Sequence, residues 1–358
     1  MQRTNFCPYK MRSKTIFFRF FLVYNLEYNK IIDGKKVKGS NMKNLKANCV
    51  SKTSVKGFEK ARKIIKRNKG LYIMLIPAVV WCFIFQYIPL YGITLAFKDF
   101  NYAKGLFGSD WAGFTYFKQF LFDAQFWEMV KNTIIVSGLK LLICMPLPLI
   151  FALMLNEVAH KGSRRFMQTL SYLPHFVSWV VIIALLNKFV SPYGGVINQI
   201  REAFGLEPVY YMGEVKWFYP LVILTHSYKS VGWNSILYLS AMAGINQELY
   251  EAAHVDGAGC WRRIFSITLP SILPTIILVF IMNVGTLMTA GFDQMYLLSN
   301  PANESVSRVL DTYTVNIGIK QGKFSLATAV GLFLSLINLS ILLVTNAISK
   351  KASEVSLF

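Results

Sequence analysis

The sequence has little charge for its length. Only 16% of its 358 residues are Asp, Glu, Lys or Arg, whereas 54% are apolar or aromatic and the mean hydropathy is +0.41. An ordinary soluble domain has about a quarter of its residues charged. A water-soluble fold of this length could not bury so much apolar surface, so the composition argues against a soluble enzyme and indicates a membrane protein with several spans.

The motifs that would carry chemistry are also missing. The five cysteines include no Cys-x-x-Cys pair, which argues against a disulfide framework and a zinc site. The four histidines form no His-Glu-x-x-His motif, and no paired carboxylates lie near a span end. A Gly-x-x-x-x-Gly-Lys-[Ser/Thr] phosphate loop is absent, since its nearest approximation at 318–323 has the wrong spacing. We therefore expect no catalytic residue, metal or cofactor in this chain.

Acidic residues are scarcest at the N-terminus. Residues 1–70 hold 19 of the 38 Lys and Arg residues but only three acids, which gives them a net charge of +16 out of +20. Basic residues before a first span satisfy the positive-inside rule and attract anionic lipid, so we expect a cytoplasmic tail at the membrane rather than a nucleic-acid-binding segment. Residues 1–41 show no helical period, and Met42 opens a more ordinary basic leader. We therefore expect translation to start at Met42.

Long apolar runs define the rest of the chain. A helix needs about 20 apolar residues to cross a bilayer. Four runs contain no Asp, Glu, Lys or Arg, and two more are each interrupted by one lysine. The fold class we predict is an all-α membrane protein with six transmembrane helices in a domain over 71–349. These helices are expected at 71–97, 132–156, 166–187, 217–245, 264–292 and 324–349.

The loop charges predict the topology. With the basic tail inside, the loops that also fall inside carry Lys161, Arg164 and Arg165, then Arg262 and Arg263. The outside loops 98–131, 191–216 and 293–323 have nearly balanced charges. Lys350 and Lys351 begin a short tail at 350–358 that also falls inside. We therefore expect both termini to be cytoplasmic in a multi-pass protein of a bacterial cytoplasmic membrane.

The loop 246–270 has unusual sequence features. Its first part, 248–255, is rich in helix formers, and Asn246 is a suitable N-cap. Gly257 and Gly259 then favour a left-handed turn. A second short helix should follow, with Pro270 at the start of the fifth span. The sequence predicts a helix–turn–helix at the inner membrane face, shaped to dock against another protein.

This loop resembles the EAA loop of bacterial binding-protein-dependent ABC importer permeases. The matching residues are Tyr250, Glu251, Ala252, Ala253, Asp256, Gly257, Ala258, Phe265, Ile267, Leu269 and Pro270. Segments 89–100, 291–294, 300–301 and 311–313 resemble permeases of the maltose-type superfamily that import oligosaccharides of plant polysaccharides. Asn246 departs from the proline found in many relatives. The resemblance covers nearly all of 65–358.

The resemblance implies a type I importer permease fold and a subunit of a larger machine. Its partners would be a second, homologous permease, two cytoplasmic ABC ATPases that bind ATP and Mg, and an extracytoplasmic solute-binding lipoprotein. Glu251 would pair with a basic residue of the ATPase, Ala252 and Ala253 would allow close approach, and Gly257 would orient the second helix. The cargo implied is a carbohydrate, with an amino acid or peptide as the alternative.

The substrate path is less marked in the sequence. Ionisable residues within spans usually face the bundle interior or a water-filled cavity, and aromatic and amide side chains can stack on and bond to a sugar. The candidates are Lys140, Tyr228, Lys229, Trp233, Asn234 and Asn283. Hydrogen bonding between helices explains such residues equally well. A gradient-driven secondary transporter is a further possibility, although no matching broken helices are evident in the two halves.

Overall fold

The computed structural model describes residues 67–353 and 356–357, and the chain divides into two units at Pro89 and Leu90. The predicted start at Met42 and most of the tail 1–70 lie outside the described residues. In the first unit, α3 (Lys69–Cys82) and the π turn η1 (Phe83–Tyr87) continue into the 3-10 segment η2 (Ile88–Phe97), whose later residues belong to the second unit. The whole helical stretch Lys69–Phe97 is long and apolar enough to cross a membrane.

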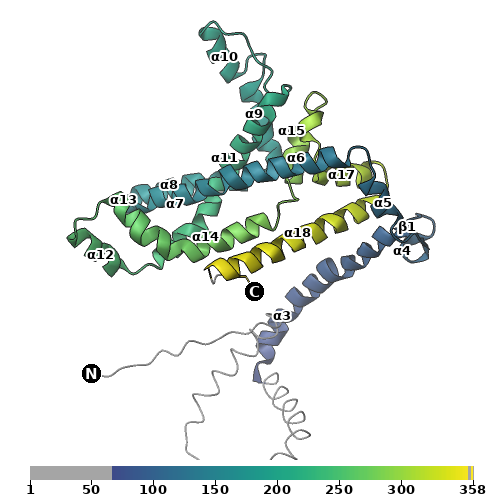
Figure 1. Cartoon of the computed structure of the whole chain (residues 1–358), viewed down its shortest axis with the longest axis horizontal. Helices are drawn as coiled ribbons and strands as arrows, with labels where there is room; N and C mark the ends of the chain where they lie inside the picture. Colours follow the sequence, from purple (N-terminus) through teal and green to yellow (C-terminus); the bar gives the residue numbers. More distant parts are fainter. Residues whose placement is uncertain (1–66, 354–355, 358) are drawn as a thin grey trace, which may run out of the picture. The chain divides into compact units, whose positions relative to one another are not determined.

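The second unit is a helical bundle (Figure 1). Helices α6 (Phe126–Leu139) and α7 (Pro146–Asn156), joined by the π turn η3 (Lys140–Cys144), form one apolar stretch. The helices that pack beside them are α8 (Lys161–Phe176), α11 (Val215–Ala243), α14 (Leu269–Val284) and α18 (Phe324–Ser353). In Figure 1, α12 (Gln247–Val255) and α13 (Cys260–Arg263) lie at one end of the bundle and α5 (Thr115–Leu121) at the other.

Shorter elements connect these helices. A two-residue ladder pairs β1 (Lys98–Asp99) with β2 (Asp110–Trp111), in the register Lys98 to Trp111. Apart from this ladder, the described elements are helical, as predicted. The remaining ones are α4 (Gly105–Gly108), α9 (Trp179–Val190), α10 (Val196–Ala203), α15 (Phe292–Leu298), α16 (Glu304–Ser307), α17 (Leu310–Val315) and the π turns η4 (Ile264–Thr268) and η5 (Asn316–Lys320).

Four of the six predicted spans coincide with helices long and apolar enough to cross a membrane. These are Lys69–Phe97, Phe126–Asn156, Cys260–Val284 and Phe324–Lys351. The predicted span 217–245 is the 29-residue helix α11, which is long enough to cross but is not among these four. Its polar residues, including Lys216, His226 and Lys229, explain the lower hydropathy.

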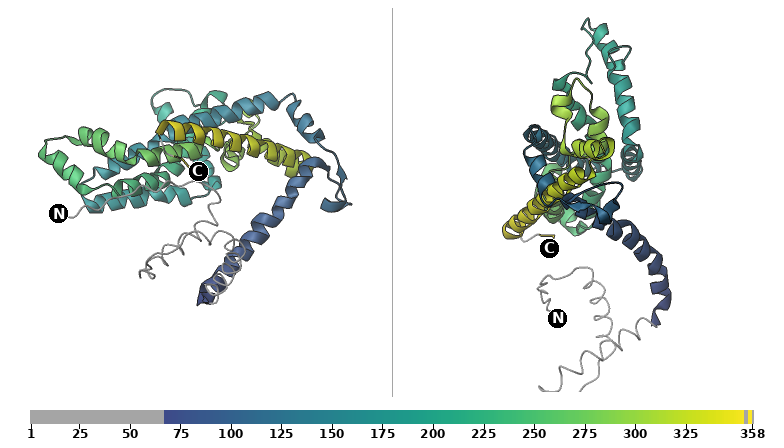
Figure 2. Two further views of the ribbon diagram at one scale, coloured as in Figure 1. Left: turned by 60° about the horizontal axis from the view of Figure 1, so that its bottom comes forward. Right: turned by 90° about the vertical axis from the view of Figure 1, so that its right-hand side faces the viewer.

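The prediction of one continuous helix over 166–187 was wrong. Helices α8 and α9 meet at an angle of 99°, and the right-hand view in Figure 2 shows α9 and α10 extending away from the bundle. Pro174 lies in the last turn of α8, and Val177 is extended. Ser178 then caps α9, where its side chain accepts the amide hydrogen of Val181. The run is free of charge throughout, so hydropathy alone did not reveal this break.

The prediction for 264–292 also needs correction at both ends. The helix already begins at Cys260, so the second short helix of the loop is continuous with the fifth span and Pro270 lies inside it. At the other end, α14 stops at Val284 and the chain is irregular from Gly285 to Gly291. Gly291 adopts φ +91°, a left-handed conformation that favours glycine, before α15 starts.

Three π turns in the structure come directly before prolines. The amide of Ile88 donates to the carbonyl of Phe83 ahead of Pro89, and that of Met145 to Lys140 ahead of Pro146. The amide of Leu269 likewise donates to the carbonyl of Ile264 ahead of Pro270. A proline ring clashes with the carbonyl four residues earlier, and a wider turn relieves this clash. Each span therefore continues through its proline.

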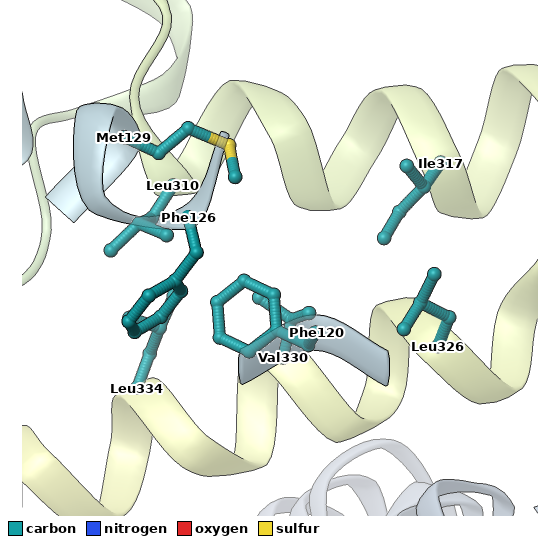
Figure 3. Close-up of a cluster of buried hydrophobic side chains, with 8 residues drawn as sticks. All are labelled: Phe120, Phe126, Met129, Leu310, Ile317, Leu326, Val330 and Leu334. Carbon is teal, nitrogen blue, oxygen red and sulfur yellow. The ribbon is translucent and has the colours of Figure 1, made fainter. Parts of the chain in front are cut away.

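At the end of the bundle opposite α12, side chains of α5, α6, α17, η5 and α18 form an apolar core (Figure 3). Phe120 and Phe126 meet edge to face, with ring centroids 4.9 Å apart. The other members of this cluster are Met129, Leu310, Ile317, Leu326, Val330 and Leu334. This core anchors the loop that leads from α17 into α18.

The connecting segments meet in two separate groups. Tyr313 donates to Asp123 at 3.1 Å, and the side chain of Asn300 donates to the carbonyl of Met212 at 2.7 Å. These bonds join the segments 98–131, 191–216 and 293–323. In the other group, Arg263 pairs with Glu157 at 3.1 Å and so joins 157–165 to 246–270. The grouping is the one that the loop charges predict for the two sides of a membrane.

Candidate functional site: a loop helix and a cavity between the helices

The loop helix forms where the sequence predicts it. Helix α12 covers Gln247–Val255, and the side chain of Asn246 accepts the amide hydrogen of Glu248 at 3.1 Å. Asn246, which departs from the proline found in many members of the resembled family, is thus the N-cap of α12. The helix carries Glu248 in its first turn, where an acidic side chain is favoured by the helix dipole.

The turn after α12 is a Schellman motif. Gly257 adopts φ +71° and donates to the carbonyl of His254 at 3.0 Å, while Ala258 donates to Ala253 at 2.8 Å. A left-handed Gly257 is therefore confirmed. Gly259 is instead extended and precedes α13 as its N-cap, so only one of the two predicted turn glycines is left-handed. No atom lies within 4 Å of a Cβ built on Gly257.

The predicted motif divides into an exposed and an inward-facing set. The exposed members can be reached by a partner protein; they are Glu251, Ala252, Asp256, Gly257, Phe265 and Pro270. The half-buried members support the loop from behind; they are Ala253, Ala258, Ile267 and Leu269. Ile267 packs against the apolar cluster formed by α7, α11 and α14. The pairing of Glu251 with an ATPase stays a prediction.

Polar contacts hold the loop together and fasten it to the bundle. The hydroxyl groups of Tyr250 and Thr268 are 2.8 Å apart, which ties α12 to the π turn η4. Glu157, the C-cap of α7, accepts from Arg263 at 3.1 Å and from the Cys260 sulfhydryl at 3.3 Å. The sequence analysis did not identify Glu157 as functional. Its only signal there was that it is the one acidic residue in the loop 157–165, which is expected on the same side of the membrane as Arg262 and Arg263.

A cavity of about 540 Å³ lies between α6–α7, α11 and α14. Of the predicted substrate-path residues, Lys140, Asn234 and Asn283 line it. Sequence reasoning missed Tyr238, a buried lining residue whose hydroxyl has no hydrogen-bond partner within the described part of the chain. The other polar lining residues are Ser137, His226, Thr286 and Thr289.

The irregular segment Gly285–Gly291 forms part of the cavity wall. Its backbone is held by side chains from the surrounding helices. Asn338 accepts from the amide of Met288 at 3.0 Å, Lys140 donates to the carbonyl of Ala290 at 2.5 Å, and Asp311 accepts from the amide of Gly291 at 2.9 Å. Irregular backbone within a span is tolerated where protein groups satisfy it or where it lines a cavity, and both conditions hold here.

The other three candidates lie away from this cavity. Tyr228 is 60% exposed, and Trp233 stacks on His175 with ring centroids 4.4 Å apart. The ammonium group of Lys229 donates to the backbone carbonyls of His175 and Val177. Lys229 and Trp233 thus lie beside the break between α8 and α9. Within residues 67–353 and 356–357, no group of three or more His, Cys, Asp or Glu side chains could hold a metal ion.

Comparison with known proteins gives a consistent set of matches. The family described as "Binding-protein-dependent transport system inner membrane component" matches residues 145–354. Protein LplB of Bacillus subtilis is 41% identical over 294 residues, which cover 82% of this chain and 92% of LplB. The polygalacturonan/rhamnogalacturonan transport system permease protein YteP of the same organism is 37% identical over 314 residues, covering 87% of this chain and 98% of YteP.

A solved structure matches as well. It is the crystal structure of a bacterial ABC transporter involved in the import of the acidic polysaccharide alginate. One of its chains superposes with a TM-score of 0.75 and 39% sequence identity, covering 82% of this chain and 99% of that one. A second structure of the alginate transporter, in complex with an alginate pentasaccharide-bound periplasmic protein, gives a TM-score of 0.74 at 38% identity.

Proposed function

The chain belongs to the family of binding-protein-dependent transport system inner membrane components, and from this premise we propose that it is the permease subunit of an ATP-driven importer of oligosaccharides. The observation that carries the proposal is the exposed motif of α12, closed by the Schellman turn at Gly257. As a permease component the chain is not an enzyme, and ATP hydrolysis belongs to separate ATPase subunits.

The proposed topology has six crossings of a bacterial cytoplasmic membrane, with both termini cytoplasmic. The four apolar helical stretches supply four crossings, the bent pair α8–α9 a fifth and α11 the sixth. A 29-residue helix is about 43 Å long, which exceeds the roughly 30 Å hydrocarbon core. The two separate groups of contacting loops support this arrangement, because each group joins only segments that it places on one side.

The coupling role falls to the loop. Exposed Glu251 would form an ion pair with a basic residue in a cleft of the ATPase, and exposed Ala252 would let the backbones approach closely. The loop transmits work only if it contacts the two ATPase states differently. The half-buried Ala258, Ile267 and Leu269 support the docking helix from behind, and the exposed Asp256 and Phe265 add to the surface that the ATPase can reach.

The cavity between α7, α11 and α14 is the proposed substrate path. Asn234, Asn283 and the Tyr238 hydroxyl offer hydrogen bonds to sugar hydroxyls, and Lys140 offers a cation beside them. A lysine suits a sugar that bears carboxylates, the class to which polygalacturonan and alginate belong. The proposed cargo is therefore an oligosaccharide of plant or bacterial polysaccharide. Tyr228, Lys229 and Trp233 remain candidates for a path outside this cavity.

The proposed assembly contains a second, homologous permease, two ATPase subunits that bind ATP and Mg, and an extracytoplasmic solute-binding lipoprotein. Purification of the tagged chain from its native membrane tests this assembly. We expect an ATPase and a second permease to copurify with the wild type. Glu251→Lys should lose the ATPase, whereas Glu202→Lys, the same charge reversal on the exposed face of α10, should keep it. A wild-type chain purified alone would contradict the proposal.

The cargo and the energy source are tested by uptake into cells that express the complete importer. Trigalacturonate should be taken up, and a tripeptide should not. Depletion of ATP should stop uptake, while collapse of the ion gradient at constant ATP should leave it intact. Uptake that depends on the gradient instead would point to a secondary transporter, and uptake of the tripeptide alone would overturn the carbohydrate assignment.

A further inference from the structure

The loop helix has few attachments of its own. None of the residues of α12 is buried, and the motif's glutamate, first alanine and aspartate all lie on its exposed side. Within the described residues, the side-chain hydrogen bond that joins α12 to another element is the contact between Tyr250 and Thr268. A helix with so few contacts could tilt independently of the bundle when a force acts on it, unless the segment after it is anchored more firmly.

That anchor is the one-turn helix α13. Its first residue, Cys260, and its last, Arg263, both donate to the same oxygen, Oε2 of Glu157. The side chains of Glu157 and Arg263 are 25% and 27% exposed, so solvent screens this ion pair less than it screens a pair on an open surface. Two donors from a single turn fix both the position and the rotation of α13 against the end of α7.

Both fastenings lead along continuous helices to the cavity. Glu157 caps α7, whose Pro148 lines the cavity nine residues earlier, about 14 Å along the helix. Thr268 belongs to the stretch Cys260–Val284, on which Met282 and Asn283 line the opposite wall. A displacement of the loop therefore reaches two walls of the cavity through two rigid elements.

We propose that Glu157 is a positioning residue for energy coupling: its ion pair with Arg263 makes α7 move together with the coupling loop, so that ATPase closure reshapes the cavity from the α7 side as well as from α14. This inference rests on the proposed function of the loop and adds the route by which its movement reaches the substrate path. Without the pair, apolar packing alone would join the loop to α7.

The native cysteine Cys144 provides a readout that needs no knowledge of the cargo. Its side chain is buried and lines the cavity. In the assembled importer, its rate of modification by N-ethylmaleimide is measured by peptide mass spectrometry, without nucleotide and after trapping with ATP and vanadate. We expect the two rates to differ by at least about fivefold in the wild type, the lower end of coupling factors between protein sites.

Glu157→Gln should bring this ratio below about twofold while the ATPase stays bound and hydrolyses ATP. The exchange Glu157→Arg with Arg263→Glu should restore the ratio, because the pair is re-formed with its charges reversed. Glu202→Gln is the matched control and should behave as the wild type. A wild-type ratio in Glu157→Gln, or an assembled exchange variant that is no better than either single variant, would overturn the inference.

A cross-link provides the second measurement, which also serves if Glu157→Gln assembles poorly. Glu157→Cys places a thiol beside native Cys260, and a short bifunctional methanethiosulfonate joins the two. If α7 and α13 move as one body, the cross-link takes the place of the lost ion pair and raises the Cys144 ratio above that of the uncross-linked Glu157→Cys importer. If the cross-linked importer shows no higher ratio than the uncross-linked one, the inference is wrong. Failure of the proposed function is distinct, because the wild-type chain would then retain no ATPase.

Discussion

Lys229 of α11 caps the C-terminal end of a different helix, α8. Its ammonium group on α11 donates to the carbonyl of His175 at 2.8 Å and to that of Val177, the last acceptors before the chain turns into α9. The same group lies 5.5 Å from the centre of the Trp179 ring, at the first residue of α9. One side chain thus satisfies the carbonyls freed at the break and contacts both helices that meet there.

Lys229→Met should therefore destabilise the break between α8 and α9. The methionine keeps most of the apolar stem but leaves two part-buried carbonyls without their donor, which costs at most the roughly 1–3 kcal/mol of a fully buried group. Thermal unfolding of the purified chain in detergent measures the effect as a lower Tm. Lys188→Met, at an exposed position of α9, is the control and should leave the Tm unchanged. Equal Tm values for the two variants would show that Lys229 does not hold the break.

Gly232→Ala should disrupt the contact of α11 with α8. A Cβ at this position would lie 2.0 Å from the backbone oxygen of Ser171, so the two helices would have to separate. Overpacking of this kind costs about 1–3 kcal/mol. Gly138→Ala in α6 is the matched control, because nothing lies within 4 Å of its Cβ. We expect a lower Tm only for the first variant; a wild-type Tm for Gly232→Ala would contradict the close packing.

The turn after α12 allows a test that separates backbone strain from crowding. Gly257 has φ +71° and open space around its Cβ position, so the effect of a side chain there must come from the backbone conformation. A β-branched residue resists this conformation, whereas asparagine tolerates it. We expect Gly257→Val to abolish uptake without preventing membrane insertion, and Gly257→Asn to keep a substantial part of it. Equal uptake by both variants would argue against a role for the turn.

The pair of Tyr313 and Asp123 predicts sensitivity to alkali. Burial, followed by the neighbouring Asp123 carboxylate, raises the pKa of Tyr313 to about 12 from its usual 10.0. Because the pKa is higher in the folded state, this contribution to stability is complete below pH 10 and is lost as the pH rises from 10 to 12. Burial and Asp99 raise the pKa of Tyr116 to about 12 as well.

Tyr313→Phe should consequently show a shallower loss of stability between pH 10 and 12 than the wild type does. The double variant Tyr116→Phe/Tyr313→Phe should be shallower still. The measurement is the denaturant midpoint of the purified chain as a function of pH. If the slope in this interval is the same in all three proteins, tyrosine ionisation does not contribute to alkaline unfolding.

Local signals in the sequence predicted the loop well. Asn246 as a cap and Gly257 as a left-handed residue each act through their nearest neighbours, so no tertiary information was needed. Hydropathy likewise located the four most apolar helical stretches. The candidates Lys140, Asn234 and Asn283 also reach one cavity, since the expectation that polar groups within spans face inward is independent of the exact packing.

The features that were missed depend on distant residues. The irregular segment up to Gly291 is uncharged in sequence, and its backbone is hydrogen-bonded by Asn338, Lys140 and Asp311 from three other parts of the chain. The ion pair between Glu157 and Arg263 spans 106 positions. Charge counts could place both residues on the same side of a membrane, but pairing them required the fold.

The π turns before Pro146 and Pro270 determine which way the cavity walls face. Each accommodates one residue more than an α-helical turn does, and each residue of an α-helix rotates the chain by about 100°. Removing a single residue from η3 would swing Pro148 out of the wall, and removing one from η4 would turn Asn283 toward another neighbour. The orientation of the path is thus specified by the residue counts of two short turns, of which η3 itself lines the cavity.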